Sequence, residues 1–251
     1  MIGTSDTDDI RLLRLAHGKA SALDLELVIA LREAIERATT DGARAIVLTG
    51  SGHILCAGVD LFRIADGGAD YVRRYLAAFR QLMFTLFTVE RALVVAANGH
   101  AIAGGAVLVA AGDYRLMAVG QGRFGYTELL VGVPFPPAAL EIIRFATPPQ
   151  RLQEMLYTGA TFPAADTHTR GLVDELVDPQ QLAERALEIA RQLARIPSES
   201  FAATKRQLRA PALARMHEYE RAYGAEVTEV WASEATRASI GAYLDSIVRK
   251  R

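Results

Sequence analysis

A short apolar segment in the middle of the chain constrains the fold more than any other feature. Leu93 to Ala97 is an apolar run with β-branched residues, which predicts a buried strand. The chain then turns at Asn98-Gly99, and after Gly104-Gly105 it is apolar on every side, as a fully buried helix would be. The segment therefore predicts a buried strand that turns into a buried helix.

The start of this helix has a chemical use. N–H groups in the first turn of a helix have no intrahelical partner and lie at the positive end of the helix dipole. Because glycine lets a ligand approach the backbone, Gly104-Gly105 could present an amide to a carbonyl oxygen that becomes negative during a reaction. The two glycines could equally serve only for close helix packing, and the segment alone does not separate these interpretations.

Composition excludes several functional classes. The chain has 251 residues, of which 51% are hydrophobic and 23% charged, and its net charge of −1 predicts no attraction to nucleic acid or to anionic membranes. Residues 92–111 are long enough to span a bilayer, but Asn98, His100 and several glycines interrupt them, so we expect no membrane span. The N-terminal residues lack the basic and apolar regions of a signal peptide, which predicts a cytoplasmic protein.

Cysteine and histidine spacing predicts no metal site and no resident cofactor. The only cysteine, Cys56, lies in an apolar run and is interpreted as a core residue rather than a nucleophile. The five histidines show no paired ligand spacing. His100, beside the glycines, is interpreted as structural.

Apolar periodicity along the chain predicts alternating strands and helices, which favours an α/β fold. Asp24 and Asp60 are expected to cap the helices that follow them, although Asp60 could also be a catalytic acid. We expect strands over 10–15, 45–49, 93–97, 113–119 and 172–177. We expect helices over 24–38, 60–64, 72–87, 104–111, 138–145, 149–157, 180–194 and 198–208, and from 211 onward with a break near Tyr223-Gly224.

Pro197 marks a predicted boundary between a core domain of residues 1–196 and a helical region of residues 197–251. The helical region has too few apolar residues to form a core alone. We therefore expect it to pack on the first domain or on another subunit.

Glu128 is a lone carboxylate among apolar and aromatic residues, including Phe124, Tyr126 and Leu129. Apolar surroundings raise the pKa of a carboxyl group, and a group titrating near neutrality can both take and return a proton. A solvent-facing glutamate at a strand end is the alternative interpretation of this segment.

Nine short motifs, in their order and spacing, resemble the crotonase superfamily, which is the enoyl-CoA hydratase/isomerase family. Each motif is weak alone, but together they cover nearly the whole chain. They occupy residues 21–24, 45–50, 56–61, 98–105, 112–115, 124–128, 132–134, 158–160 and 171–174.

This resemblance implies an α/β, crotonase-like spiral of repeated strand-strand-helix turns with a C-terminal helical region that builds homotrimers or dimers of trimers. It implies an acyl-CoA thioester substrate and an oxyanion hole made by the backbone N–H groups of Val59 and Gly104. It places near the substrate Ala22, Leu23, Ala57, Leu61, Phe62, Gly105 and Val107. Candidates for the acyl pocket, each equally interpretable as core, are Leu86, Phe87, Tyr126 and Phe135. The family's usual basic residue in the C-terminal helix is not clearly matched in residues 243–247, which leaves the contacts to the CoA phosphates open.

The catalytic pair departs from the family's hydratase pattern. Hydratases resemble one another in two glutamates, and the first position is here Val107, which can neither bind water nor transfer a proton. Glu128 matches the second, and a lone later glutamate is similar to enoyl-CoA isomerases, which implies a 1,3-proton shift. Two alternatives stay open: hydration or another superfamily reaction with Glu141 or Asp60 as the missing acid, and a non-catalytic scaffold that binds acyl-CoA, a protein or RNA.

Overall fold

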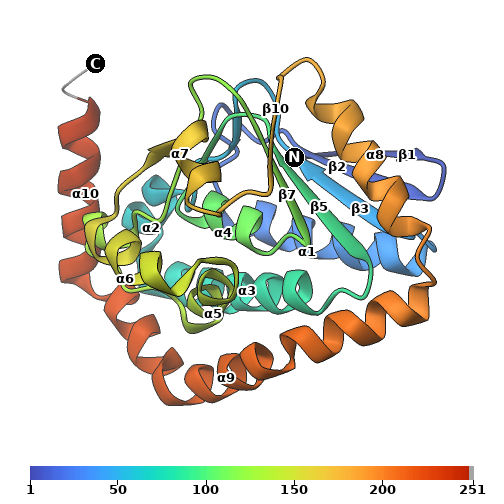
Figure 1. Ribbon diagram of the computed structural model, residues 1–251. Helices are drawn as coiled ribbons and strands as arrows, with labels where there is room; N and C mark the ends of the chain where they lie inside the picture. Colours follow the sequence, from blue (N-terminus) through green and yellow to red (C-terminus); the bar gives the residue numbers. More distant parts are fainter. Residues whose placement is uncertain (249–251) are drawn as a thin grey trace.

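Two β-sheets carry the fold in the computed structural model, which describes residues 1–248 (Figure 1). The larger sheet contains, in spatial order, β1 (Ile2–Thr7), β2 (Ile10–Leu15), β3 (Ala45–Thr49), β5 (Ala92–Ala97), β7 (Tyr114–Ala118) and β10 (Glu175–Val177). The smaller contains β4 (Ile54–Cys56), β6 (His100–Ile102), β8 (Arg123–Gly125) and β9 (Phe162–Pro163). Neighbouring strands are parallel except β1 with β2 and β8 with β9.

From β3 to β8, successive strands alternate between the two sheets, which confirms the predicted spiral. β3 leads into β4, β5 into β6 and β7 into β8, and helices follow each pair. The first pair is followed by α2 (Leu61–Asp66) and α3 (Gly68–Thr88), and the second by α4 (Gly104–Ala110). After the third come η1 (Glu128–Val131), α5 (Pro137–Ala146) and α6 (Pro149–Thr158), and α7 (Ala164–Thr169) follows β9.

Alternate residues of the central strands face two separate cores, as the two-residue period of a strand requires. Ile46 and Leu48 of β3 point into the larger core with α3, α4 and α1 (Leu25–Thr40). Ala45 and Val47 face the other way, where α8 (Leu182–Ala194) covers the sheet. Both faces of β3 and β5 are therefore buried, which explains their uninterrupted apolar sequences.

The C-terminal helices wrap around the spiral instead of forming a core of their own. α9 (Ser198–Ala232) packs on α3 and α5 along the lower edge of Figure 1, and α10 (Glu234–Val248) rises beside α2. This confirms packing on the first part of the chain, one of the two arrangements expected. Residues 249–251 of the predicted helical region lie outside the described residues.

The predicted helix breaks in this region are wrong. α9 runs without interruption through Pro211 and Gly224. Arg209 and Ala212 are both buried, so packing on either side of Pro211 outweighs the ~3 kcal/mol that an interior proline costs. The break lies instead at Ser233, which is extended and whose Oγ accepts the N–H of Thr236 at 3.1 Å.

Several short or exposed elements were not predicted from the sequence. β1 is a polar edge strand without an apolar pattern, and β6 and β8 have only three residues each. The strand expected over 172–177 is shorter and begins at Glu175, because the preceding Asp174 pairs through its backbone and carboxylate with Arg115. Among residues 1–248 there is no helix with the length and apolarity to cross a bilayer.

Candidate active site

Glu128 is a buried carboxylate with an unused oxygen. It begins η1, immediately after β8, and is 7% exposed. Phe124 and Tyr126 are fully buried before it, with ring centroids 5.4 Å apart. Within the described chain, Glu128 Oε2 has no hydrogen-bond partner. Burial raises the pKa of Glu128 to about 7, and the backbone N–H groups of Glu128 and Thr127 partly offset that effect.

Two backbone amides lie where the resemblance places an oxyanion hole. Leu23 donates its N–H to the Gly58 oxygen at 2.7 Å and accepts the N–H of Asp60 at 3.0 Å. The N–H of Val59, between these two residues, therefore faces away from Leu23. Gly104 is the first residue of α4, so its N–H has no acceptor within the helix. Both amides are thus available to a ligand oxygen.

Stacking of the spiral turns brings these groups together. Gly58 has a φ of +89°, and a Cβ on it would lie 2.7 Å from the Ala103 Cβ and 3.3 Å from the Gly104 nitrogen. Ala103 in turn donates its N–H to the oxygen of Gly125, at the end of β8, at 2.8 Å. The loops after β4, β6 and β8 are therefore neighbours, and they carry Val59, Gly104 and Glu128 respectively.

Ala103 has a strained backbone that aims the Gly104 amide. Its φ of +50° and ψ of −121° are unusual for a residue with a side chain. Hydrogen bonds hold it on both sides, from its N–H to Gly125 and from the Val107 N–H to its oxygen. Since ψ of Ala103 sets the direction of the next peptide, this strain orients the Gly104 N–H.

A cavity of about 520 Å³ gathers four of the residues predicted to contact CoA. They are Ala22, Ala57, Leu61 and Phe62, and Val59 lines the same cavity. Phe62 is 57% exposed, as a stacking surface for a ligand would be. Leu23 does not line the cavity, because it is fully buried and its backbone holds the Val59 loop.

Sequence analysis missed two polar residues of this cavity, His17 and Lys19. His17 Nε2 lies 2.7 Å from Asp24 Oδ2, while Asp24 Oδ1 caps α1 by accepting the N–H of Leu27 at 2.7 Å. Lys19 is exposed and brings a positive charge to the cavity. The predicted helix cap at Asp24 could have indicated His17, because a carboxylate that caps a helix with one oxygen can bind a side chain of a neighbouring loop with the other.

Other residues expected near the substrate are part of the packing. A Cβ on Gly105 would lie 2.2 Å from the Cys56 oxygen, so this glycine permits close helix packing. Val107 is fully buried and offers only hydrocarbon. Phe87 lies under the Arg209 guanidinium, 4.6 Å from it, and therefore belongs to the contact with α9. Leu86 and Tyr126 are fully buried, whereas Phe135 is half-buried after η1.

The other candidate catalytic side chains already have structural partners. Glu141 is fully buried, and its two oxygens each lie 2.8 Å from an arginine, Arg144 and Arg215. Asp60 caps α2 through the N–H of Arg63. Cys56 is buried, as expected, and burial raises the pKa of its thiol to about 12. His100 accepts the N–H of Arg123 at 3.3 Å, which agrees with a structural role.

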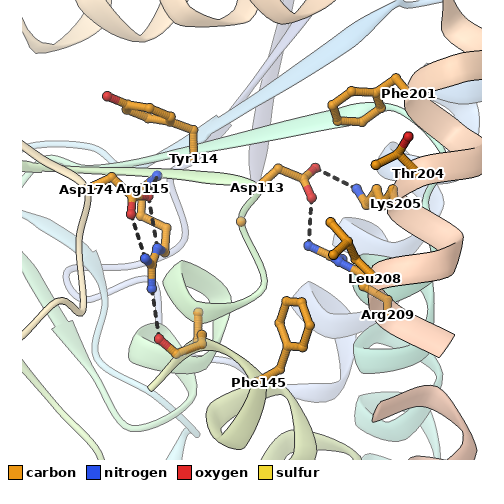
Figure 2. Close-up of a pocket in the computed structure, with 13 residues that line it drawn as sticks. Asp113, Tyr114, Arg115, Phe145, Asp174, Phe201, Thr204, Lys205, Leu208 and Arg209 are labelled. Carbon is orange, nitrogen blue, oxygen red and sulfur yellow. Dashed lines mark hydrogen bonds and ion pairs between the residues drawn. The ribbon is translucent and has the colours of Figure 1, made fainter. Parts of the chain in front are cut away.

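A second cavity of about 530 Å³ lies under α9 and holds a buried charge cluster (Figure 2). Asp113 pairs with Lys205 at 2.6 Å and with Arg209 at 2.7 Å. Arg209 also donates to the oxygens of Phe87 and Ala111, at the ends of α3 and α4. Burial lowers the pKa of Lys205 to about 8. The cluster thus supplies hydrogen-bond donors to backbone oxygens at the C-terminal ends of α3 and α4, and it holds α9 on the core.

Comparison with known proteins agrees with this architecture. The family model described as enoyl-CoA hydratase/isomerase matches residues 7–247. A Thermus thermophilus protein named "Putative enoyl-CoA hydratase" is 31% identical over 194 residues, which are 76% of each chain. The mitochondrial enoyl-CoA delta isomerase 1 of Mus musculus is 24% identical over 254 residues, covering 100% of this chain and 88% of the mouse protein.

Among solved structures, human mitochondrial delta3-delta2-enoyl-CoA isomerase superposes with a TM-score of 0.93. The superposition covers 100% of this chain and 99% of the human chain at 22% identity, which establishes the shared fold. The match to the family model over nearly the whole sequence establishes the family. This chain belongs to the enoyl-CoA hydratase/isomerase family.

Proposed function

We propose that this protein isomerises 3-enoyl-CoA to 2-trans-enoyl-CoA through a single carboxyl group, Glu128. The observation that carries the proposal is a buried carboxylate with an unused oxygen beside two backbone amides that are free to bind a ligand. The relatives named above include both a hydratase and an isomerase, so the assignment rests on the chemistry of these groups.

In the first step, the thioester oxygen accepts hydrogen bonds from the N–H groups of Val59 and Gly104. The Glu128 carboxylate removes a proton from C2, and the electrons of that C–H bond move toward the carbonyl. The resulting dienolate carries its negative charge mainly on the thioester oxygen, where preoriented donors stabilise it. A pKa near 7 suits Glu128 to act as a base at neutral pH.

In the second step, the same carboxyl group returns the proton at C4. The C3–C4 double bond moves to C2–C3 as the carbonyl re-forms, so the product has the mass of the substrate. The reaction needs a carboxyl group and two amides, and we propose that no metal or further cofactor takes part.

Hydration is the second candidate, because the Thermus relative bears a hydratase name. Adding water requires a group that positions the water and a group that transfers its proton. Val107 cannot do either, and the carboxylates of Glu141 and Asp60 are engaged in ion pairs and a helix cap. These engagements favour isomerisation.

The test is mass-resolved chromatography of the products from 3-hexenoyl-CoA and, separately, from 2-trans-hexenoyl-CoA. We expect a conjugated isomer of unchanged mass from the first substrate, and its loss in Glu128→Gln. Glu141→Gln is the matched control, since it changes another buried glutamate and should retain the reaction. A product heavier by one water would support hydration instead.

We also propose that the protein is a homotrimer or a dimer of trimers and acts in the cytoplasm. Leu208, Phe145 and Phe201 line the cavity under α9, and Leu208 is 66% exposed, so this face offers apolar surface to another subunit. Analytical ultracentrifugation tests the assembly, and a monomer at all concentrations would exclude it.

A further inference from the structure

The Tyr75 hydroxyl is a second buried polar group without a partner. Tyr75 lies on α3 and is 1% exposed, and its hydroxyl oxygen has no hydrogen bond within residues 1–248. Its ring is stacked on those of Tyr71 and Phe79, with centroids 6.5 and 5.8 Å away. Stacking on both sides restrains the ring and therefore the direction of its hydroxyl.

The ionisable groups whose charge acts on this hydroxyl include Glu128 and Cys56, so both lie in its neighbourhood. Apart from Tyr71, the ionisable groups that act on its charge are Cys56, Asp24 and Glu128. Cys56 begins the loop that carries Val59, and its sulfur accepts the N–H of Gly58 at 3.3 Å. The proposed reaction places the acyl part of the substrate beside Glu128, which is one of these groups.

None of these neighbours is bonded to the hydroxyl. The two oxygens of Asp24 already bind Leu27 and His17. Glu128 Oε2 is also without a partner, so it and the Tyr75 hydroxyl do not bond to each other. Each of these buried polar atoms costs free energy while it is unpaired, so a bound group that pairs with it is favoured.

Core packing alone does not account for this tyrosine. Phenylalanine would stack on Tyr71 and Phe79 equally well without burying an unpaired hydroxyl. Burial raises the pKa of Tyr75 well above its usual value, so the group keeps its proton and acts as a hydrogen-bond donor. Its partner must therefore supply an acceptor. A second carboxylate beside Glu128 would add an unfavourable like charge, so an uncharged oxygen fits best.

We propose that Tyr75 determines substrate specificity by donating a hydrogen bond to an uncharged oxygen, a hydroxyl or keto group, on the acyl chain of the substrate. This inference rests on the proposed function, because it assumes that the acyl group lies beside Glu128. Acyl-CoA thioesters with an oxygenated acyl chain are then preferred over plain hydrocarbon chains. A site built to bond a substrate oxygen discriminates against the analogue that lacks it, since the protein donor is then left unpaired.

The test is titration calorimetry with saturated thioesters, which bind without any proton transfer. Hexanoyl-CoA is compared with 4-, 5- and 6-hydroxyhexanoyl-CoA on the wild-type protein, on Tyr75→Phe and on Tyr71→Phe. Tyr71 is the matched control, because its hydroxyl already accepts the N–H of Leu25 at 3.2 Å. Circular dichroism confirms that both variants fold.

We expect one hydroxylated thioester to bind wild type about 10-fold to 100-fold more tightly than hexanoyl-CoA. Tyr75→Phe should abolish that preference and bind hexanoyl-CoA at least as tightly as wild type does, whereas Tyr71→Phe should keep the preference. Equal binding of all four thioesters to wild type, binding of none, or a preference that survives in Tyr75→Phe would each overturn the inference. A preference for the oxygenated chain in a protein that does not isomerise 3-hexenoyl-CoA would refute the proposed reaction and leave the role of Tyr75 standing.

Discussion

Glu128 and Glu141 are both buried glutamates, yet their surroundings are opposite. Glu141 joins α5 to α9, and each of its oxygens is paired with an arginine. Glu128, at the start of η1, has no arginine or lysine partner within the described chain, and one of its oxygens has no hydrogen bond. Both are 7% exposed or less, so burial alone does not separate them.

The difference separates a glutamate that links two helices from the glutamate that we propose as the proton shuttle. A buried carboxylate with two arginine partners links the two helices that carry the partners. A buried carboxylate without them is poised near neutrality, where it can exchange a proton. The lack of charged partners is therefore what distinguishes Glu128 from Glu141 and supports its proposed role.

The largest expected effect is on turnover in Glu128→Gln. The amide cannot take a proton from C2, so kcat for isomerisation of 3-hexenoyl-CoA should fall by about 10²- to 10⁴-fold. Glu141→Gln should stay within a few-fold of wild type. Comparable losses of kcat in both variants would show that the two glutamates do not differ in function.

The backbone amides of Val59 and Gly104 sharpen the comparison, because the proposed reaction also needs donors that stabilise the negative charge on the thioester oxygen. Gly58→Ala adds a Cβ against Ala103 at a φ of +89° and should displace the Val59 and Gly104 amides. We expect kcat/KM to fall by about 10²- to 10³-fold. Gly52→Ala is the control, since Gly52 also has a positive φ but open space around it. Equal losses at the two positions would show that backbone strain alone is responsible.

The free energy of unfolding should fall in Glu141→Gln, the variant whose turnover is expected to change little. Glu141→Gln removes the charge that pairs with Arg144 and Arg215 and should destabilise the protein by about 2–4 kcal/mol, near the low end for a broken buried pair because both arginines are partly exposed. Urea unfolding at pH 8 measures this change. An unchanged free energy of unfolding would mean that the α5–α9 link does not depend on the ion pairs.

The smallest effect is a pH-dependent gain in Glu128→Gln. The folded pKa of Glu128, about 7, lies above its ordinary 4.5, so between these values the folded protein binds the extra proton. The free energy of unfolding of the wild-type protein therefore falls as pH rises from 4.5 to 7. Glutamine does not titrate, so the variant lacks this loss. The variant should be more stable by about 1–3 kcal/mol at pH 8 and should gain almost nothing at pH 4. A gain of equal size at both pH values would contradict the raised pKa.

Regular, well-packed elements were predictable from sequence. β3 and β5 are buried on both faces, so their apolar runs are unbroken, and the helices after Asp24 and Asp60 begin at those caps. The burial of Glu128 did not follow from its segment alone, which also fitted a solvent-facing glutamate at a strand end. Its assignment as the proton shuttle needed the family resemblance, because sequence spacing does not show which carboxylates lack partners.

Features that depend on contacts between distant segments were not predictable. α9 continues through Pro211 because long-range contacts hold it on both sides: Arg209 binds Asp113 before the proline (Figure 2), and Arg215 binds Glu141 after it. Tyr75 fits the apolar stripe of α3 as well as any core residue, and only the surroundings of its hydroxyl set it apart. The packing contacts of Gly105 with Cys56 and of Phe87 with Arg209 likewise join distant segments.

The most direct test of the account is a carbon-13 NMR titration of the glutamate side-chain carboxyl groups. The Glu128 resonance is identified as the one that is missing from Glu128→Gln. Since burial without a charged partner raises its pKa, we predict a titration midpoint close to 7. A midpoint near the ordinary value of 4.5 would show that Glu128 is solvated or paired, and it would contradict the proton-shuttle mechanism.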